Sequence, residues 1–413
     1  MIAHSLPRNT KASLIALAAG IGAGVAVRFA GHDGLTALAA PAASIGRVWG
    51  AALQITVIPL IVCILIVGLA GSSGRIVGRL GGLSLIVFLS MLVSGEVMSI
   101  LAMPPMLRLF GVEHSVLRHL MHPNAAAATP TQDIVQAIAT NNLLNVMLVA
   151  LVVAIAMTRI GEAPRRRLLE FFEAALDVVF VVLGWLLSVL PLVVFALSYS
   201  MVVRTGFSAT RALASFVAIA ITLLVVFTIA LYPMTMIFAK RGLREFAKAT
   251  APVQAVAIST RSSIASLPAL LEGGQRLGIP EPVNAFVMPL CVAVFKANRT
   301  ITGMVKLFFL AWVCGVELTP LTIAAYGGSI LLFSFISPGT PGAATFTSTA
   351  PLLAIGIPIE AIVLVHAVDD IPDIFKTVTN VTANMTATAV VARYADVEDT
   401  EAAALEPADV TAA

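Results

Sequence analysis

Long apolar segments dominate this sequence and leave few folds open to it. Six of them, each long enough to cross a bilayer as a helix, lie near residues 12–30, 47–71, 80–107, 132–158, 175–203 and 212–238. Of the 413 residues, 59% are hydrophobic and 11% are charged, whereas a soluble domain carries about 25% charged residues. The segments are continuous instead of alternating, which disfavours a β-barrel. We therefore predict an all-α polytopic membrane protein.

The loops between these segments carry unequal numbers of basic residues. Twelve Lys and Arg residues fall on the side of the N-terminus and six on the other side. Because cytoplasmic loops are enriched in Lys and Arg, we predict a multi-pass protein of the cell (inner) membrane with both termini in the cytoplasm. The basic and then apolar N-terminus could also be a signal peptide. No small-residue cleavage site follows it, which favours a first membrane helix.

Catalytic and metal-binding motifs are not evident in the sequence. His114, His119 and His122 share the longest external loop, 108–131, where a solvated loop is favoured over a metal site. The apolar segments contain no HExxH, GxSxG or Cys/His cluster. We therefore expect no enzyme, no cofactor and no metal, and the net charge of +3 gives no indication of a nucleic-acid partner.

The apolar pattern changes after residue 250. Residues 251–274 are interrupted by a serine cluster and a proline, and residues 320–358 are interrupted by the stretch SPGTPG. Each interrupted segment precedes a long segment with charged residues in its middle, 281–313 and 359–393. Interrupted segments at corresponding positions of two repeats are typical of the binding site of a secondary transporter, because non-helical backbone at membrane depth must be buried or line a wet cavity. Two ordinary helices kinked by Pro and Gly are the alternative.

Several motifs carry a resemblance to a known family. They are the serine-rich stretch 259–268, the turn GTPGAA at 339–344 and the polar stretch 369–384, with Ile58–Leu60 and Ala139–Leu144 in the N-terminal half. In this order and spacing they resemble the glutamate transporter family, the dicarboxylate/amino acid:cation symporters. The first two look like the two hairpin tips of the family and the third like its last helix. The resemblance covers nearly the whole chain.

The resemblance implies a detailed architecture. It has eight transmembrane helices and two re-entrant helical hairpins, arranged as inverted repeats and assembled as a homotrimer in the lipid bilayer. A scaffold of four helices would support a transport domain that carries substrate by an elevator motion, with the second hairpin as a gate. The implied ranges are 1–79 for scaffold helices 1–2, 80–131 for transport-domain helix 3 and the external loop, 132–211 for scaffold helices 4–5, 212–393 for the rest of the transport domain (helix 6, hairpin 1, helix 7, hairpin 2, helix 8) and 394–413 for a disordered cytoplasmic tail.

The expected sodium sites depart from the family pattern. The stretch KANRT at 296–300 stands where the seventh helix of the family reads Asn-Met-Asp-Gly-Thr, so Asn298 replaces the aspartate of that motif. The asparagine and the aspartate bind sodium in the family. Asn384 likewise replaces an aspartate that closes another sodium site. At least two carboxylates of the implied sodium cage are therefore missing.

A lysine replaces one of the sodium ligands. Its ammonium has only donors and cannot ligate a cation. We therefore expect Lys296 to supply a tethered ammonium near the place of a sodium ion, paired with the buried carboxylate of Glu96, which Arg299 could share. The alternative is that Lys296 and Arg299 face an aqueous cavity as a purely structural pair.

The last helix carries the implied substrate site. Asp373 lies where the family holds a substrate amino group, and Lys376 takes the place of an arginine that binds the side-chain carboxylate. Lysine keeps the charge but loses the bidentate fork. If Asp373 and Lys376 instead pair with each other, a small neutral solute fits the site. The remaining implied substrate contacts are Arg261, Ser262, Ser263, Thr300, Thr340, Pro341, Gly342, Thr377 and Asn380.

These residues lead to a functional prediction. We predict a secondary active transporter of an acidic amino acid or a C4-dicarboxylate. Glu96, Asp369, Asp370 and Asp373 could each carry a proton, because burial disfavours a charged carboxylate, so proton coupling or exchange fits better than sodium coupling. Residual sodium use at backbone carbonyls beside the second hairpin stays open. The alternatives are a transporter of a small neutral amino acid and a non-transporting membrane sensor or partner subunit derived from the family.

Overall fold

The computed structural model of the protein describes residues 10–30, 33–70, 79–117, 143–205, 207–336 and 343–395. Every regular element within these ranges is helical, which confirms the predicted all-α class. Several predictions lie outside the described residues: Thr340, Pro341 and Gly342 of the second hairpin tip, the loop residues His119 and His122, the stretch Ala139–Asn142 and the tail from residue 396.

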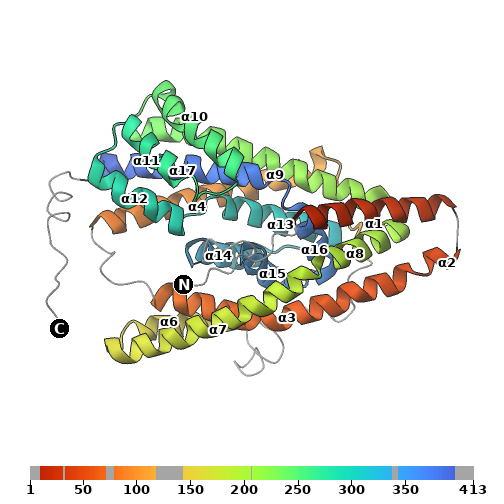
Figure 1. The fold of residues 1–413 in the computed structure, drawn as a ribbon. Coiled ribbons are helices and arrows are strands. Elements are labelled where there is room, and N and C mark those ends of the chain that lie inside the picture. Colours follow the sequence, from red (N-terminus) through yellow and green to blue (C-terminus); the bar gives the residue numbers. More distant parts are fainter. Residues whose placement is uncertain are drawn as a thin grey trace. The chain divides into compact units, whose positions relative to one another are not determined.

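The described helices belong to two compact units (Figure 1). The first unit lies within residues 1–73, 102–219 and 303–371, and the second within 74–101, 220–302 and 372–413. Three helices contribute to both units, and among the described residues the chain also passes between the units after α16. These elements are α4 (Arg79–Leu109), α9 (Phe207–Met234), α13 (Asn298–Cys314) and α16 (Ile359–Val368).

The first unit is a helical assembly in which α1 packs against α8 and α3 packs against α6, α7 and α8. Helices α14, α15 and α16 also contact α3, so that α3 packs against helices from both halves of the sequence. The other described helices of this unit are α1 (Thr10–Ala30), α2 (Asp33–Thr36), α3 (Ala39–Ala70), α6 (Leu143–Met157), α7 (Glu162–Ser188), α8 (Leu190–Thr205), α14 (Pro320–Ile336) and α15 (Ala343–Ala354).

Glycines bring α1 and α8 close together. A Cβ atom added to Gly20 would lie 2.1 Å from Ser198 Oγ and 2.6 Å from the Phe195 carbonyl oxygen. One turn further along, a Cβ on Gly24 would lie 2.8 Å from Val202 Cβ. Small residues at four-residue spacing allow two helix backbones to approach closely, which is a common basis of helix association in membranes.

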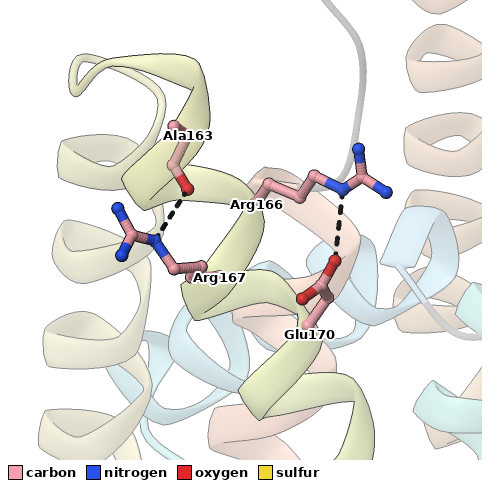
Figure 2. A network of polar contacts seen from close by, with 4 residues as sticks. All are labelled: Ala163, Arg166, Arg167 and Glu170. Carbon is pink, nitrogen blue, oxygen red and sulfur yellow. Dashed lines mark hydrogen bonds and ion pairs between the residues drawn. The ribbon is translucent and has the colours of Figure 1, made fainter.

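The first turns of α7 carry an exposed basic cluster (Figure 2). Arg166 Nε lies 3.1 Å from Glu170 Oε1, and Arg167 Nε donates to the Ala163 carbonyl at 3.4 Å. An exposed pair four residues apart on one helix contributes only about 0.3–0.5 kcal/mol. The pair therefore adds little stability.

Helix α17 (Asp373–Tyr394) is the centre of the second unit. Its residues from Thr379 to Ala389 are all buried, although the sequence of this helix is rich in threonine. It contacts the π-helical turn η3 and helices α10, α11 and α12. These elements are η3 (Thr235–Ala239), α10 (Leu243–Thr260), α11 (Leu267–Arg276) and α12 (Glu281–Val294).

Hydrogen bonds explain how such a polar helix can be buried. Thr377, Thr379, Thr382 and Thr388 each donate to the carbonyl four residues earlier, at 2.8–3.0 Å. Three further bonds of 2.8–2.9 Å join α17 to its neighbours: Thr228–Thr379, Thr235–Thr386 and Gln254–Thr382. Because buried hydroxyls with partners cost little, the helix can present hydroxyls instead of hydrocarbon to its neighbours.

Among the described residues, two helices are long and apolar enough to cross a membrane, Leu80–Leu109 and Thr210–Ala239. The bent pair Glu162–Leu186 and Leu190–Arg204, with 50° between its two parts, would be a third if it counts as one span. These helices support a membrane protein. The predicted total of eight spans and two re-entrant hairpins stays a prediction.

The α1–α8 packing gives a matched pair of variants. We expect Gly20→Ala to destabilise the protein by about 1–3 kcal/mol, because the added methyl group collides with a backbone carbonyl of α8. Gly22→Ala is the control, since nothing lies within 4 Å of its added Cβ and alanine is favoured in a helix by about 1 kcal/mol. Melting temperatures of the detergent-solubilised protein measure the difference. Equal melting temperatures for the two variants would contradict the close packing.

Candidate functional site

The apolar run with the charged centre is not one helix. Helix α12 ends at Val294, Phe295 has extended backbone (φ −102°, ψ 110°), and α13 starts at Asn298. The interruption therefore covers Phe295, Lys296 and Ala297. The fully buried ring of Phe295 stacks on Phe88 of α4 with 4.7 Å between the ring centroids. Such an interruption leaves the last carbonyls of α12 and the first N–H groups of α13 without helical partners.

Lys296 supplies one of the missing partners. Its side chain is buried, and Nζ donates to the Val292 carbonyl at 2.5 Å and to Ser263 Oγ at 3.2 Å. Val292 belongs to the last turn of α12, where a cation is favoured by the helix dipole. Ser263 belongs to the turn between α10 and α11. One side chain thus joins the interrupted helix to the predicted first hairpin tip.

The structure differs from the expected pair of Lys296 and Glu96. Both hydrogen bonds of Lys296 go to other groups, and the buried carboxyl of Glu96 in α4 makes no ion pair within the described residues. Glu96 Oε2 is buried without a hydrogen-bond partner there. The physical reason is that the Val292 carbonyl lies one turn before Lys296 and is left open by the helix end, so the ammonium finds a local acceptor.

The turn between α10 and α11 is held by its own hydroxyls. Ser262 Oγ accepts the Ala265 N–H at 3.2 Å, and Ser266 Oγ donates to the Ser262 carbonyl at 2.8 Å. Arg261 ends α10 in the left-handed conformation (φ +50°), with its side chain exposed. These local bonds leave the Ser263 hydroxyl available to Lys296. That the two helices form a re-entrant hairpin in the membrane stays a prediction.

Asn298 connects the start of α13 to α17. Its backbone N–H donates to Asn380 Oδ1 at 3.0 Å, and its Nδ2 donates to the Lys376 carbonyl at 3.3 Å. Asp373 is the first residue of α17 and Lys376 lies one turn further on, with Thr377 Oγ1 bonded to the Asp373 carbonyl at 3.0 Å. The predicted residues of the interrupted helix and of the last helix therefore lie together. Opposite charges one turn apart can bind an ammonium and a carboxylate of one small molecule.

Within the described residues, two predicted residues have no side-chain hydrogen bond beyond their own helical turn. Thr300 is fully buried, and its hydroxyl donates to the Ala297 carbonyl at 3.3 Å. Asn384 is also fully buried, and neither atom of its side-chain amide has a hydrogen-bond partner within the described residues. Burying an amide without hydrogen-bond partners costs free energy of folding, so Asn384 is a destabilising polar group in the interior of this unit. Within the described part of the chain, no group of three or more His, Cys, Asp or Glu residues is placed to hold a metal ion.

Two buried charged residues, Lys306 and Glu360, were not among the predicted site residues. Lys306 lies in α13 and is 4% exposed. Its Nζ lies 2.8 Å from Asp369 Oδ2, at the C-terminal end of α16. The signal in the sequence was a lysine within the apolar run ITGMVKLFFLAW. A lysine in such a run needs a partner when it is buried.

Comparison with known proteins places these residues in a family context. Residues 10–394 match the model of the sodium:dicarboxylate symporter family, so the chain belongs to this family of integral membrane transporters. It is 26% identical over 379 residues to the proton/sodium-glutamate symport protein of Bacillus subtilis (strain 168), covering 85% of each chain. It is 25% identical over 380 residues to the C4-dicarboxylate transport protein of Laribacter hongkongensis (strain HLHK9), covering 86% of this chain and 83% of that one. It is also 23% identical over 361 residues to the proton/glutamate-aspartate symporter of Escherichia coli (strain K12), covering 83% and 82%. The predicted family resemblance is confirmed.

Asn380 and Asn384 lie one turn apart on α17 and give opposite predictions. We expect Asn380→Leu to destabilise the protein by about 1–3 kcal/mol, because it leaves the part-buried N–H of Asn298 without its acceptor. We expect Asn384→Leu to be neutral or stabilising, since it replaces an amide without partners by hydrocarbon of similar size. Thermal unfolding of both purified variants checks this order. A lower melting temperature for Asn384→Leu than for Asn380→Leu would contradict it.

Proposed function

We propose that the protein is a secondary active transporter of a small carboxylate, an acidic amino acid or a C4-dicarboxylate, that works without the usual sodium sites of the family. The relatives are named as carriers of glutamate, aspartate or C4-dicarboxylates. Asp373 and Lys376 offer a carboxylate and an ammonium one turn apart, which matches the two kinds of charge of an acidic amino acid. The other proposed substrate contacts are the predicted residues of the two hairpin tips, Thr300, Thr377 and Asn380.

The observation that carries the proposal is the place of Lys296. Its ammonium is buried at the helix interruption, bonded to a helix-end carbonyl and to a hairpin hydroxyl. Carbonyl and hydroxyl oxygens are the ligands that a bare hard cation would use. A tethered ammonium on such oxygens provides positive charge that needs no ion from solution. We therefore propose that this tethered group takes the place of a bound cation and is not exchanged during transport.

Coupling is then assigned to a proton or to exchange. Glu96 is the leading candidate for the proton carrier, because its buried carboxyl has one oxygen without a hydrogen-bond partner in the described residues. An unpaired buried carboxylate is costly and is relieved by binding a proton. Asp373 and Asp370 remain further candidates. The relatives whose names include a proton are compatible with this assignment.

The proposed mechanism follows the architecture that the family resemblance implies. Four scaffold helices within 1–79 and 132–211 would hold a homotrimer together in the cell membrane, and the remaining helices would carry the substrate in an elevator motion. The N- and C-termini would face the cytoplasm. Crosslinking of the purified protein in lipid, followed by mass determination, tests the homotrimer.

Uptake into proteoliposomes tests the coupling proposal. We expect labelled aspartate, glutamate or succinate to accumulate under an imposed proton gradient in sodium-free buffer. Lys296→Asn should lose at least about nine-tenths of this uptake, because it removes the tethered charge, and Lys248→Met, an exposed lysine of α10, should retain it. Strict dependence of the wild-type protein on sodium would overturn the tethered-cation proposal. No uptake of all three compounds would favour a neutral solute or a non-transporting protein.

Lys376 gives a separate prediction about specificity. We expect Lys376→Met to raise the KM for a dicarboxylate by about 10- to 100-fold, because a charge-assisted hydrogen bond contributes about 1.5–3 kcal/mol. Lys376→Arg should keep the KM within a few-fold of the wild-type value, since it preserves the positive charge. Initial rates of uptake over a range of substrate concentrations measure both. An unchanged KM in Lys376→Met would place the carboxylate site elsewhere.

A further inference from the structure

The buried ion pair of Lys306 and Asp369 lies outside the proposed substrate site. Its two side chains are 5% and 11% exposed, and Nζ lies 2.8 Å from Oδ2. The pairs Arg166–Glu170, Arg241–Glu245 and Arg276–Glu272, by contrast, join partly or fully exposed side chains four residues apart on one helix. Lys306 and Asp369 come from different helices and are 63 positions apart (369 − 306). A buried pair of this kind is better evidence for defined geometry than for stability.

The pair lies close to two places where the chain passes between the units. Lys306 is one turn into the part of α13 that belongs to the first unit, which starts at Gly303. Asp369 lies just before the chain leaves the first unit after Ile371. The ion pair therefore joins α13 to the end of α16 inside the first unit.

Helix α13 has a second attachment, inside the second unit. There Asn298, at the start of α13, is bonded to the Lys376 carbonyl and to Asn380 Oδ1 of α17. Helix α13 runs without interruption from Asn298 to Lys306, a length of about 12 Å at 1.5 Å per residue. Within the second unit the start of α13 is thus attached to α17, and within the first unit Lys306 is attached to the end of α16.

The elbow, residues 369–372 between α16 and α17, is short and is held by backbone hydrogen bonds. Asp369 N–H donates to the His366 carbonyl at 3.2 Å, Ile371 N–H to the Val368 carbonyl at 3.1 Å and Lys376 N–H to the Pro372 carbonyl at 3.0 Å. Asp373 lies four positions after Asp369, and four positions along the chain span at most about 14 Å. Anchoring Asp369 therefore restrains the backbone from which α17 starts.

From these contacts we infer that Lys306 and Asp369 are a positioning pair, which holds the elbow before α17 and thereby sets the places of Asp373 and Lys376. The inference rests on the proposed function, because it takes these two residues as the substrate site. Neither Lys306 nor Asp369 needs to touch the substrate. The pair acts on the substrate through the backbone of the elbow.

Tyr326 of α14 provides a control in the same buried surroundings. It is 1% exposed and lies near Asp369, and its hydroxyl has no hydrogen-bond partner within the described residues. Replacing this hydroxyl by hydrogen removes a polar atom without breaking the ion pair. Tyr326→Phe should therefore leave substrate affinity within about twofold of the wild-type value.

The test compares affinity with stability in the full-length protein in lipid nanodiscs. We expect Lys306→Met to raise the Kd for aspartate, glutamate or succinate at least tenfold, since a displacement of about 1 Å can cost about 100-fold. Lys306→Arg keeps the charge and should recover most of the affinity. Isothermal titration calorimetry gives Kd, and thermal unfolding reports stability. A wild-type Kd in Lys306→Met would overturn the inference, and so would the loss of affinity in Tyr326→Phe.

The double variant Lys306→Met/Asp369→Leu guards against a failure to fold. Replacing a buried ion pair by apolar residues of similar size is often neutral or stabilising. A merely structural pair would therefore give a double variant with both wild-type stability and wild-type affinity, and this result would overturn the inference. A positioning pair should give wild-type stability with a Kd raised at least tenfold.

Hydrogen exchange separates this inference from the proposed function. In the absence of substrate, amides 370–380 should exchange at least tenfold faster in the double variant than in the wild-type protein, whereas amides in the buried part of α17 beyond Asn384 should be unchanged. If wild-type protein binds none of the three compounds, the proposed function fails, and this comparison still decides whether the pair holds the elbow. Equal exchange over 370–380 would overturn the inference.

Discussion

The second unit depends on how a threonine-rich helix is buried. Helix α17 has hydroxyls where a buried helix ordinarily presents hydrocarbon, and each bond back to a carbonyl of the same helix removes the cost of burying a hydroxyl. The hydroxyls that also reach α9, η3 and α10 fix the rotation of α17 about its axis. That rotation decides which side chains of its first turns face the interrupted helix. The substrate site therefore follows from the packing of polar groups as much as from apolar packing.

The interruption between α12 and α13 is stabilised by side chains in place of helical bonds. Lys296 satisfies a carbonyl at the end of α12, and Asn380 accepts the first N–H of α13. Both helix ends are thus completed by residues that also belong to the proposed site. Backbone that departs from a helix at membrane depth needs such partners. A ligand that competes for these groups would alter the helix ends themselves, which links occupancy of the site to local structure.

The sequence predicted the class of fold, because that depends on local patterns. It did not predict the interruption between α12 and α13, since the apolar pattern of residues 281–313 indicates one long segment. Apolar runs of sufficient length imply helices, and a cluster of cations in the middle of one run implies polar surroundings. Partners were harder to predict. Glu96 was expected beside Lys296 on charge alone, whereas the nearer acceptor was a backbone carbonyl that appears only once α12 ends. The partner of Lys306 could not be predicted either. Hydrophobic periodicity shows where a helix lies, but it does not show that a carboxylate 63 positions later in the chain lies beside this lysine.

Lys296 and Lys306 lie ten positions apart and are both buried, yet their acceptors differ in kind. Lys296 is bonded to two neutral oxygens, so its positive charge is not cancelled by them and contributes to the field at the site. Lys306 faces a carboxylate at 2.8 Å, so that its charge is compensated locally and little field extends beyond the pair. The first lysine is therefore suited to replace a bound cation, and the second to hold backbone in place. The chemistry of the acceptor, more than the presence of a buried lysine, separates the two roles.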